Sequence, residues 1–419
     1  MKRLFTALKV LERIVNDKKS FSVAINDTCR KEKIGGDTRK EITTLVGCAL
    51  RHYLILDSRF SAICKDEKQM TLAAVLGASN ILYAKKVSKE DTNKFLKEII
   101  TNAEFLKQVN ELISSFENGE PLINKDLDNN CLEFLSFRYN TPLWLVKMWR
   151  KHYGYKIMRK ILIANSKHFN NYAKLNLEFI DQERFERENP IFAKTSFDKF
   201  YLYQDKGQVK KSIQYIDRLI YVYPIAFDEM VKAADVDSLR GIAAFAGTPN
   251  NLISALSSNI SSYFEMDYLI GKQQAYFEIK SEKQHYNLKN VHLYEGQADS
   301  GIACFSKKVH TFFVIPESSK FFMLRNTPDY FIHFEQSSLD GLIQEQTKAL
   351  EDCSAFVEDD GYLVYTVPTI SEKETHGIVN KFLENHPEFV FVCDKQIFPF
   401  TEYDSTMYYA VLRKVKSND

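Results

Sequence analysis

Residues 239–259 read LRGIAAFAGTPNNLISALSSN, and this stretch decides the fold of the C-terminal half. An apolar run at 239–244 is followed by a turn with Gly247 and Pro249, and then by helical spacing over 250–259. Further along the chain, strand-like runs alternate with helical segments at 262–266, 272–286, 291–294, 311–315, 339–357, 362–367, 374–385, 389–393 and 407–415. This alternation predicts a doubly wound α/β domain with a mostly parallel sheet.

The stretches before it have different patterns. Residues 1 to about 115 carry apolar side chains at spacings of three and four, which predicts a purely helical domain. Short β-rich runs at 172–180 and 219–223 indicate a small α+β region. We therefore predict an α+β multidomain protein. Its parts are a helical domain at 1–135, a middle region with basic helices and small α+β structure at 136–235, and a Rossmann-type domain at 236–419.

Composition excludes several classes of protein. Only 15 of 419 residues are Gly, which argues against a generous glycine-rich phosphate loop. No run approaches the roughly 18 apolar residues of a membrane span, and no signal peptide is visible, so we expect a cytoplasmic protein with no membrane partner. Seven scattered cysteines lack a C-x-x-C pair, and the nine histidines lack metal-ligand spacing, so no disulfide framework and no metal site is expected.

A net charge of +1 conceals a basic segment, because the 44 residues from 134 to 177 contain no Asp or Glu. Its cations, together with Trp144 and Trp149, suit contact with RNA phosphates and unpaired bases. The candidate RNA-binding residues within it are Arg138, Lys147, Arg150, Lys151, Lys156, Arg159 and Lys160. The alternative is a solvated helix face whose Trp144 packs inward. Composition leaves both interpretations open.

Several short motifs occur in a shared order that resembles one family. They are Leu45-Val46-Gly47-Cys48-Ala49-Leu50-Arg51, Pro142-Leu143-Trp144-Leu145-Val146, Arg325-Asn326-Thr327-Pro328-Asp329, Leu363-Val364-Tyr365-Thr366 and Tyr408-Tyr409-Ala410-Val411-Leu412. The chain thereby resembles the bacterial 16S rRNA (cytosine-C5) methyltransferase B family over nearly its whole length. The resemblance implies a NusB-like RNA-binding helical domain, a role in rRNA processing and a domain that binds S-adenosylmethionine (SAM). It adds Arg325 to the RNA-binding candidates.

The family's catalytic positions lack their cysteines in this chain. Methylation at C5 of cytosine needs a thiolate that adds to the base. The resemblance places that nucleophile at Pro368, which has no nucleophilic atom. A second cysteine, which assists product release in the family, corresponds to Glu317 or to Ser318, depending on which proline anchors the alignment. No catalytic residue is therefore assigned.

The cofactor motif departs from the family as well. The loop that resembles the SAM-binding loop has Phe245 in place of proline, and Ala246 precedes the single Gly247, which permits a turn with positive φ. Asp267, at the expected end of the second strand, is the candidate for the ribose hydroxyls, and Gln297 stands where an acid contacts adenine. These four cofactor positions are Ala246, Gly247, Asp267 and Gln297. The pattern predicts weak or absent SAM binding.

Three functions remain open from the sequence. The first is an RNA-binding protein of this family, with ribosomal RNA as partner, that has lost cysteine-dependent catalysis. The second is an active SAM-dependent rRNA methyltransferase with divergent motifs, in which Glu317 and Asp329 act as acid and base. The third is a protein-interaction module built on the helical domain.

Overall fold

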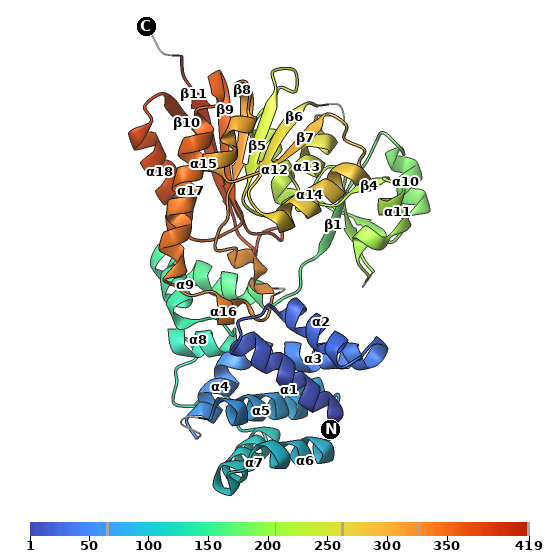
Figure 1. Ribbon diagram of the computed structural model, residues 1–419, viewed down its shortest axis with the longest axis vertical. Coiled ribbons are helices and arrows are strands. Elements are labelled where there is room, and N and C mark those ends of the chain that lie inside the picture. Colours follow the sequence, from blue (N-terminus) through green and yellow to red (C-terminus); the bar gives the residue numbers. More distant parts are fainter. Residues whose placement is uncertain (64–66, 206, 261–263, 326, 417–419) are drawn as a thin grey trace. The chain divides into compact units, whose positions relative to one another are not determined.

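The computed structural model describes residues 1–63, 67–205, 207–260, 264–325 and 327–416. The chain forms two compact units (Figure 1). The helical unit comprises Met1–Ser166 and Met323–Gln336, and the α/β unit comprises Lys167–Phe322 and Ser337–Asp419. The units divide the chain at Ser166 rather than at the predicted boundary at 135, so the basic helices that follow 135 belong to the helical unit. None of the described helices is both long enough and apolar enough to cross a membrane.

The helical unit confirms the predicted all-helical N-terminal region. Its main helices are α1 (Lys2–Val15), α2 (Phe21–Lys31), α3 (Gly36–Arg51), α4 (Tyr53–Ser61), α5 (Lys68–Ser79), α6 (Lys89–Ile99), α7 (Ala103–Glu117), α8 (Leu132–Arg138) and α9 (Leu143–Asn165). Helix α1 shows how the sequence fixes them: Leu4, Leu8 and Leu11 recur on one face and are buried. Side chains cap the later helices, since Ser88 accepts from the Asp91 amide and Asn102 from the Phe105 amide.

A distant segment completes the helical unit. It follows strand β8 (Val309–Ile315) in the chain and contains α16 (Tyr330–His333). Asp329 Oδ2 accepts a hydrogen bond of 2.7 Å from the Phe21 amide at the first turn of α2. Lys18 Nζ donates to the Ile332 carbonyl at 2.6 Å. The motif that contains Arg325 and Asp329 is thereby tied to the helical unit, while Asn326 lies outside the described residues.

The α/β unit contains a seven-stranded sheet in the order β10-β11-β9-β8-β5-β6-β7. The strands are β5 (Ile242–Ala246), β6 (Met266–Ile270), β7 (Val291–Glu295), β8, β9 (Val357–Val367), β10 (Phe389–Ile397) and β11 (Met407–Lys414). Neighbours from β7 to β9 pair in parallel, and β11 runs antiparallel to β9 and β10. The predicted α/β domain with a mostly parallel sheet is therefore confirmed.

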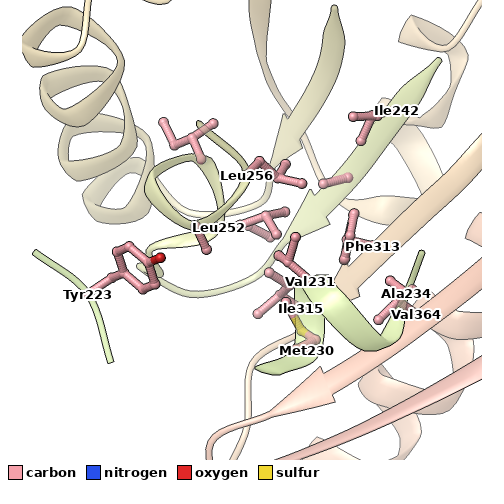
Figure 2. Close-up of a cluster of buried hydrophobic side chains, with 14 of the residues drawn as sticks. Tyr223, Met230, Val231, Ala234, Ile242, Leu252, Leu256, Phe313, Ile315 and Val364 are labelled. Atoms are coloured by element: carbon pink, nitrogen blue, oxygen red, sulfur yellow. The ribbon is translucent and has the colours of Figure 1, made fainter. Parts of the chain in front are cut away.

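Helices cover both faces of this sheet. They are α12 (Ile225–Ala233), α13 (Leu252–Asn259), α14 (Gln273–His285), α15 (Ala298–Gly301), α17 (Ser338–Ser354) and α18 (His376–Asn385). Figure 2 shows Leu252 and Leu256 of α13 packed with Ile242 and Ile315 of the sheet. Ala243 and Phe245 belong to the cluster on the other face. Strand β5 is thus buried on both sides, as its apolar sequence requires.

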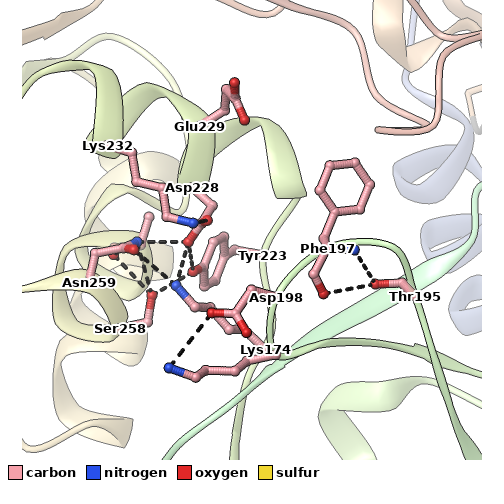
Figure 3. A network of polar contacts seen from close by, with 12 residues as sticks. Lys174, Thr195, Phe197, Asp198, Tyr223, Asp228, Glu229, Lys232, Ser258 and Asn259 are labelled. Carbon is pink, nitrogen blue, oxygen red and sulfur yellow. Dashed lines mark hydrogen bonds and ion pairs between the residues drawn. The ribbon is translucent and has the colours of Figure 1, made fainter.

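A small sheet of order β2-β3-β1-β4 precedes the large one in the chain. Its strands are β1 (Asn171–Leu175), β2 (Phe192–Lys194), β3 (Phe200–Tyr203) and β4 (Ile220–Tyr221), with short helices α10 (Gln182–Glu188) and α11 (Ile213–Ile216). Lys174 of β1 donates to Asp228 Oδ1 of α12 at 2.5 Å and to Asn259 Oδ1 of α13 at 2.9 Å (Figure 3). Lys174 is therefore a buried structural cation rather than part of a basic surface.

Candidate functional site

The carboxyl ends of β5, β6, β7 and β8 meet at one edge of the sheet, where α/β proteins of this type bind ligands. A glycine follows each of the first three strands and continues the ladder. The Gly247 amide donates to the Ile315 carbonyl at 2.9 Å, and the Gly271 amide donates to the Ala246 carbonyl at 2.8 Å. The structure thus brings Ala246, Gly247 and Gln297 to this edge, as the sequence predicts.

Gly247 is required for close packing rather than for a left-handed turn. A Cβ at this position would lie 2.5 Å from the Glu317 amide nitrogen and 3.1 Å from the Pro316 carbonyl carbon. Its φ is outside the positive region, so the turn with positive φ that a glycine permits is not formed here. Ala246, the last residue of β5, is fully buried. The backbone at Gly247 therefore lies directly against the backbone at Pro316 and Glu317.

The space beside Gly271 is filled by two side chains. The Phe245 ring lies 3.5 Å from the position of a Cβ on Gly271, and Gln297 Oε1 lies 3.1 Å from it. Gln297 Nε2 also donates to the Gly271 carbonyl at 2.8 Å. The carboxamide that the sequence assigned to an adenine contact is thus bound to the chain's own backbone.

An ion-pair triad joins the segments after β6 and β8. Lys272 Nζ lies 2.6 Å from Glu317 Oε2, and Lys320 Nζ lies 2.6 Å from Glu317 Oε1. Because β5 lies between β6 and β8 in the sheet, the Lys272–Glu317 pair passes over the end of β5. The Glu317 side chain is only 14% exposed. Each carboxylate oxygen is therefore paired with a lysine, so Glu317 is poorly suited to serve as a general base.

Asp267 lies inside β6, so the predicted strand end was wrong. The strand runs to Ile270, which places Asp267 second in the strand and paired in register with Ala243 and His292. The Tyr294 hydroxyl donates to Asp267 Oδ1 at 3.3 Å. The residue that follows the strand and Gly271 is Lys272, a cation where a ribose hydroxyl would need an acceptor. The end of β6 therefore presents a cation rather than an acceptor at this edge.

A buried polar network lies near Pro368 and Ser318, two positions where the resembling family has cysteines. Pro368 directly follows β9. Beside it, Glu374, fully buried, accepts from the Ser319 amide at 2.8 Å and from Ser319 Oγ at 2.6 Å. Gln346 Nε2 donates to Glu374 Oε1 at 3.0 Å and to the Glu317 carbonyl at 2.8 Å. These bonds fix the segment that carries Glu317 and Ser318.

The cysteines nearest this edge remain thiols at neutral pH. Burial, reinforced by the charge of Asp267, raises the pKa of Cys304 to about 11. Burial also raises the pKa of Cys353, which is fully buried on α17. A nucleophilic cysteine needs the opposite environment, one that lowers the thiol pKa. Neither residue replaces the missing nucleophile.

The basic segment covers most of α8 and all of α9, and Gly154, where φ is 75°, interrupts α9. All seven cations predicted within them are exposed: Arg138, Lys147, Arg150, Lys151, Lys156, Arg159 and Lys160. Arg325 is only 7% exposed, which does not favour the predicted RNA contact. Trp149 is fully buried, and Trp144 packs 6.4 Å from Phe334, ring centre to ring centre. Trp149 thus belongs to the core, and the half-buried Trp144 packs against Phe334.

Sequence reasoning missed Lys272 and Glu374. The sequence pattern places Lys272 in the helical segment 272–286, because the strand expected at 262–266 ends before β6 does, at Ile270. Glu374 lay in the cluster Glu372-Lys373-Glu374, which resembles an ordinary acidic helix start, and nothing in that pattern distinguishes the buried carboxylate from the exposed one. The signal for Lys272 was available, since the apolar run Tyr268–Ile270 ends at Gly271.

Comparisons with known proteins identify the fold. A scan with protein-family models and a search of curated proteins each gave no match. The crystal structure of PH0851 matches with a TM-score of 0.76 at 15% identity, covering 99% of this chain and 98% of that one. A methyltransferase homolog protein from Pyrococcus horikoshii matches with a TM-score of 0.58 at 15% identity; the match covers 69% of this chain and 100% of that one. NSun6 from the same organism, determined with SFG, matches with a TM-score of 0.58 at 10% identity; the match covers 66% of this chain and 99% of that one. The chain thus has a multidomain α+β fold that is similar to the folds of these three structures.

Proposed function

We propose that this chain is an RNA-binding protein that has kept a methyltransferase fold and lost methyl transfer. The observation that carries the proposal is the basic face of α8 and α9, where seven exposed cations stand in a segment without any acidic residue. Exposed cations on adjoining helices attract the phosphates of a nucleic acid. The partner we propose is ribosomal RNA, on the basis of the resemblance of the sequence motifs.

Three features support the loss of catalysis. Pro368 provides no nucleophile, and Glu317, at one of the two positions for the second cysteine, is paired with two lysines. The end of β5, where SAM would lie in such a fold, is crossed by the Lys272–Glu317 pair and flanked by Phe245 and Gln297. The alternative of a divergent active enzyme assigned acid–base roles to Glu317 and Asp329. Asp329 is 1% exposed and accepts a hydrogen bond from the Phe21 amide, so its carboxylate stabilises the start of α2.

The test is binding of the full chain to fluorescently labelled fragments of 16S rRNA, measured by anisotropy over a range of salt concentrations. Phosphate contacts give a logarithmic salt slope of roughly −0.7 for each neutralised phosphate of a single strand, so up to seven contacts predict a slope between about −2 and −5. Binding that is absent at low salt, or that does not change with salt, would contradict the proposal. Methyl incorporation from SAM into the same RNA would contradict its second half.

A further inference from the structure

A pocket of about 310 Å³ lies in the α/β unit, away from the edge described above. Its walls come from the segment after β1, from β4 and the residue pair before it, and from the end of α14 with the loop that leads into β7. These elements lie close together in Figure 1. Asn290, which lines the pocket, accepts the Met266 amide at the start of β6. The pocket is therefore at the amino ends of β6 and β7, opposite the candidate cofactor edge.

Aromatic rings form one side of this pocket. Tyr221 and Tyr286 pack with ring centres 4.8 Å apart and planes tilted by 35°, and both are buried. Phe179, which also lines the pocket, is 52% exposed. An exposed ring that lines a pocket offers a stacking surface for an unpaired base, and stacking tolerates any base because each has a π face.

Cations and amides complete the lining. Arg218 and Lys289 supply two positive charges against the one carboxylate of Glu178, and Asn287 and Asn290 expose carboxamides, which both donate and accept. Within the described residues, neither Arg218 nor Lys289 is held in an ion pair. Cations suit a phosphate, and carboxamides suit the mixed donor and acceptor edge of a base. Together with the rings they provide a recognition group for each part of a nucleotide.

The backbone around the pocket is fixed in advance. Arg218 has a φ of 59°, in the left-handed region that is unfavourable for a side chain with a Cβ. Asn176, 3% exposed, holds this turn: its Nδ2 donates to the Arg218 carbonyl at 3.0 Å, and its Oδ1 accepts the Glu178 amide at 3.2 Å. One side chain thus ties the segment that carries Arg218 to the segment that carries Phe179. Such pre-organisation reduces the entropy lost on binding.

We propose that this pocket binds a single unpaired nucleotide of an RNA strand, with its base stacked on Phe179 and its phosphate contacting Arg218 and Lys289. The volume suits one nucleotide, since it lies at the lower end of the roughly 300–1,000 Å³ of ligand pockets. The inference rests on the proposed RNA-binding function and adds a second contact point to it. It assigns no catalytic role, because the pocket lies at the opposite edge from the catalytic positions of the fold.

The test uses the full chain with two pocket variants, each with a matched control. Arg218→Gly removes the cation and also suits the positive φ, so the fold should be retained. Its control is Lys199→Gly, another cation at positive φ (60°) outside the pocket. Phe179→Ala removes the ring, and its control is Phe277→Ala, which is 59% exposed on α14 and lies outside the pocket lining. Anisotropy with a labelled short oligouridine should show about tenfold weaker binding for each pocket variant. Each control should stay within about twofold.

The outcomes separate this inference from the proposed function. If oligouridine binds and the two pocket variants match their controls, the inference is overturned while RNA binding by the chain stands. If the full chain binds no RNA, the proposed function fails, and ligand-observed NMR with the ribonucleoside monophosphates then decides on the pocket. Saturation transfer that Arg218→Gly abolishes and Lys199→Gly preserves supports a nucleotide site. No transfer from the unmodified chain overturns it.

Discussion

Lys272 Nζ lies 2.6 Å from Glu317 Oε2, across the end of β5. The two residues follow β6 and β8, the strands on either side of β5. In a doubly wound sheet this edge is where a ligand would enter, and here a direct ion pair connects the flanking segments. Lys320 Nζ lies 2.6 Å from the other oxygen of Glu317, so both carboxylate oxygens form ion pairs with lysines of this chain.

We expect Glu317→Gln to lower the free energy of unfolding by about 1 kcal/mol, because the substitution leaves two lysines without their counter-ion at a partly buried site. The control is Glu278→Gln on α14, an exposed residue that accepts from Gln274 Nε2 at 3.1 Å. Urea unfolding measures both. Equal effects of the two substitutions would contradict a stabilising role for the triad, and added salt should reduce the effect of Glu317→Gln.

The basic face of α9 predicts a change in salt dependence. Replacing Lys147, Arg150 and Lys151 by Ala should reduce the magnitude of the logarithmic salt slope of RNA binding by about 2, since roughly 0.7 is lost per phosphate contact. The control replaces Lys94, Lys97 and Lys107, exposed residues on α6 and α7, by Ala. Anisotropy with labelled rRNA fragments measures both slopes. The same loss in both triple variants would mean that RNA binding reflects overall charge alone.

Cys304 should be almost unreactive at neutral pH. With its pKa raised to about 11, roughly one molecule in a thousand carries the thiolate at pH 8. Because the thiolate is the reacting form, alkylation by iodoacetamide should accelerate about tenfold per pH unit from 8 to 10. Asp267→Asn should raise the rate, since the Asp267 charge contributes to the shift. Mass spectrometry reports the modification, and the urea-unfolded chain provides the reference rate. Rapid alkylation of the folded chain at pH 7 would refute this environment.

The buried pair in Figure 3 predicts a large loss of stability. Asp228 accepts from Lys174, from the Tyr223 hydroxyl at 2.9 Å and from Asn259 Nδ2 at 2.8 Å. Asp228→Ala leaves the buried Lys174 ammonium unpaired and should lower the free energy of unfolding by about 3–5 kcal/mol. Adding Lys174→Met removes that charge and should recover part of the loss.

The control for this pair is Asp198→Ala. Asp198 lies 3.7 Å from Lys199 in an exposed ion pair, and its side chain is 74% exposed. This substitution should change the unfolding free energy by no more than about 0.5 kcal/mol. A comparable loss for Asp198→Ala and Asp228→Ala would show that the buried network adds nothing beyond a surface pair.

The fold could be predicted from the sequence because periodicity reports burial directly. Strands such as β5 are apolar on both faces, and helices such as α1 repeat apolar residues every three or four positions. The end of β6 could not be placed in this way. Asp267 looked like a terminator, yet it is tolerated within the strand because its carboxylate is only half-buried and accepts the Tyr294 hydroxyl.

The candidate site was predictable in part. The exposed cations of α8 and α9 could be found because the segment 134–177 has no acidic residue. The burial of Arg325 and the role of Asp329 could not, because they depend on a segment that packs with helices some 300 positions earlier in the chain. The triad of Lys272, Glu317 and Lys320 likewise joins residues from two loops. Such long-range pairings leave no local pattern.

The most direct test of the central claim is titration of the purified full chain with SAM by isothermal calorimetry. A methyltransferase fold whose cofactor edge is crossed by the Lys272–Glu317 pair should give no binding heat, or a dissociation constant weaker than about 1 mM, which corresponds to roughly −4.1 kcal/mol. A dissociation constant in the micromolar range would contradict this account, because the residues at the ends of β5 and β6 would then have to hold the cofactor.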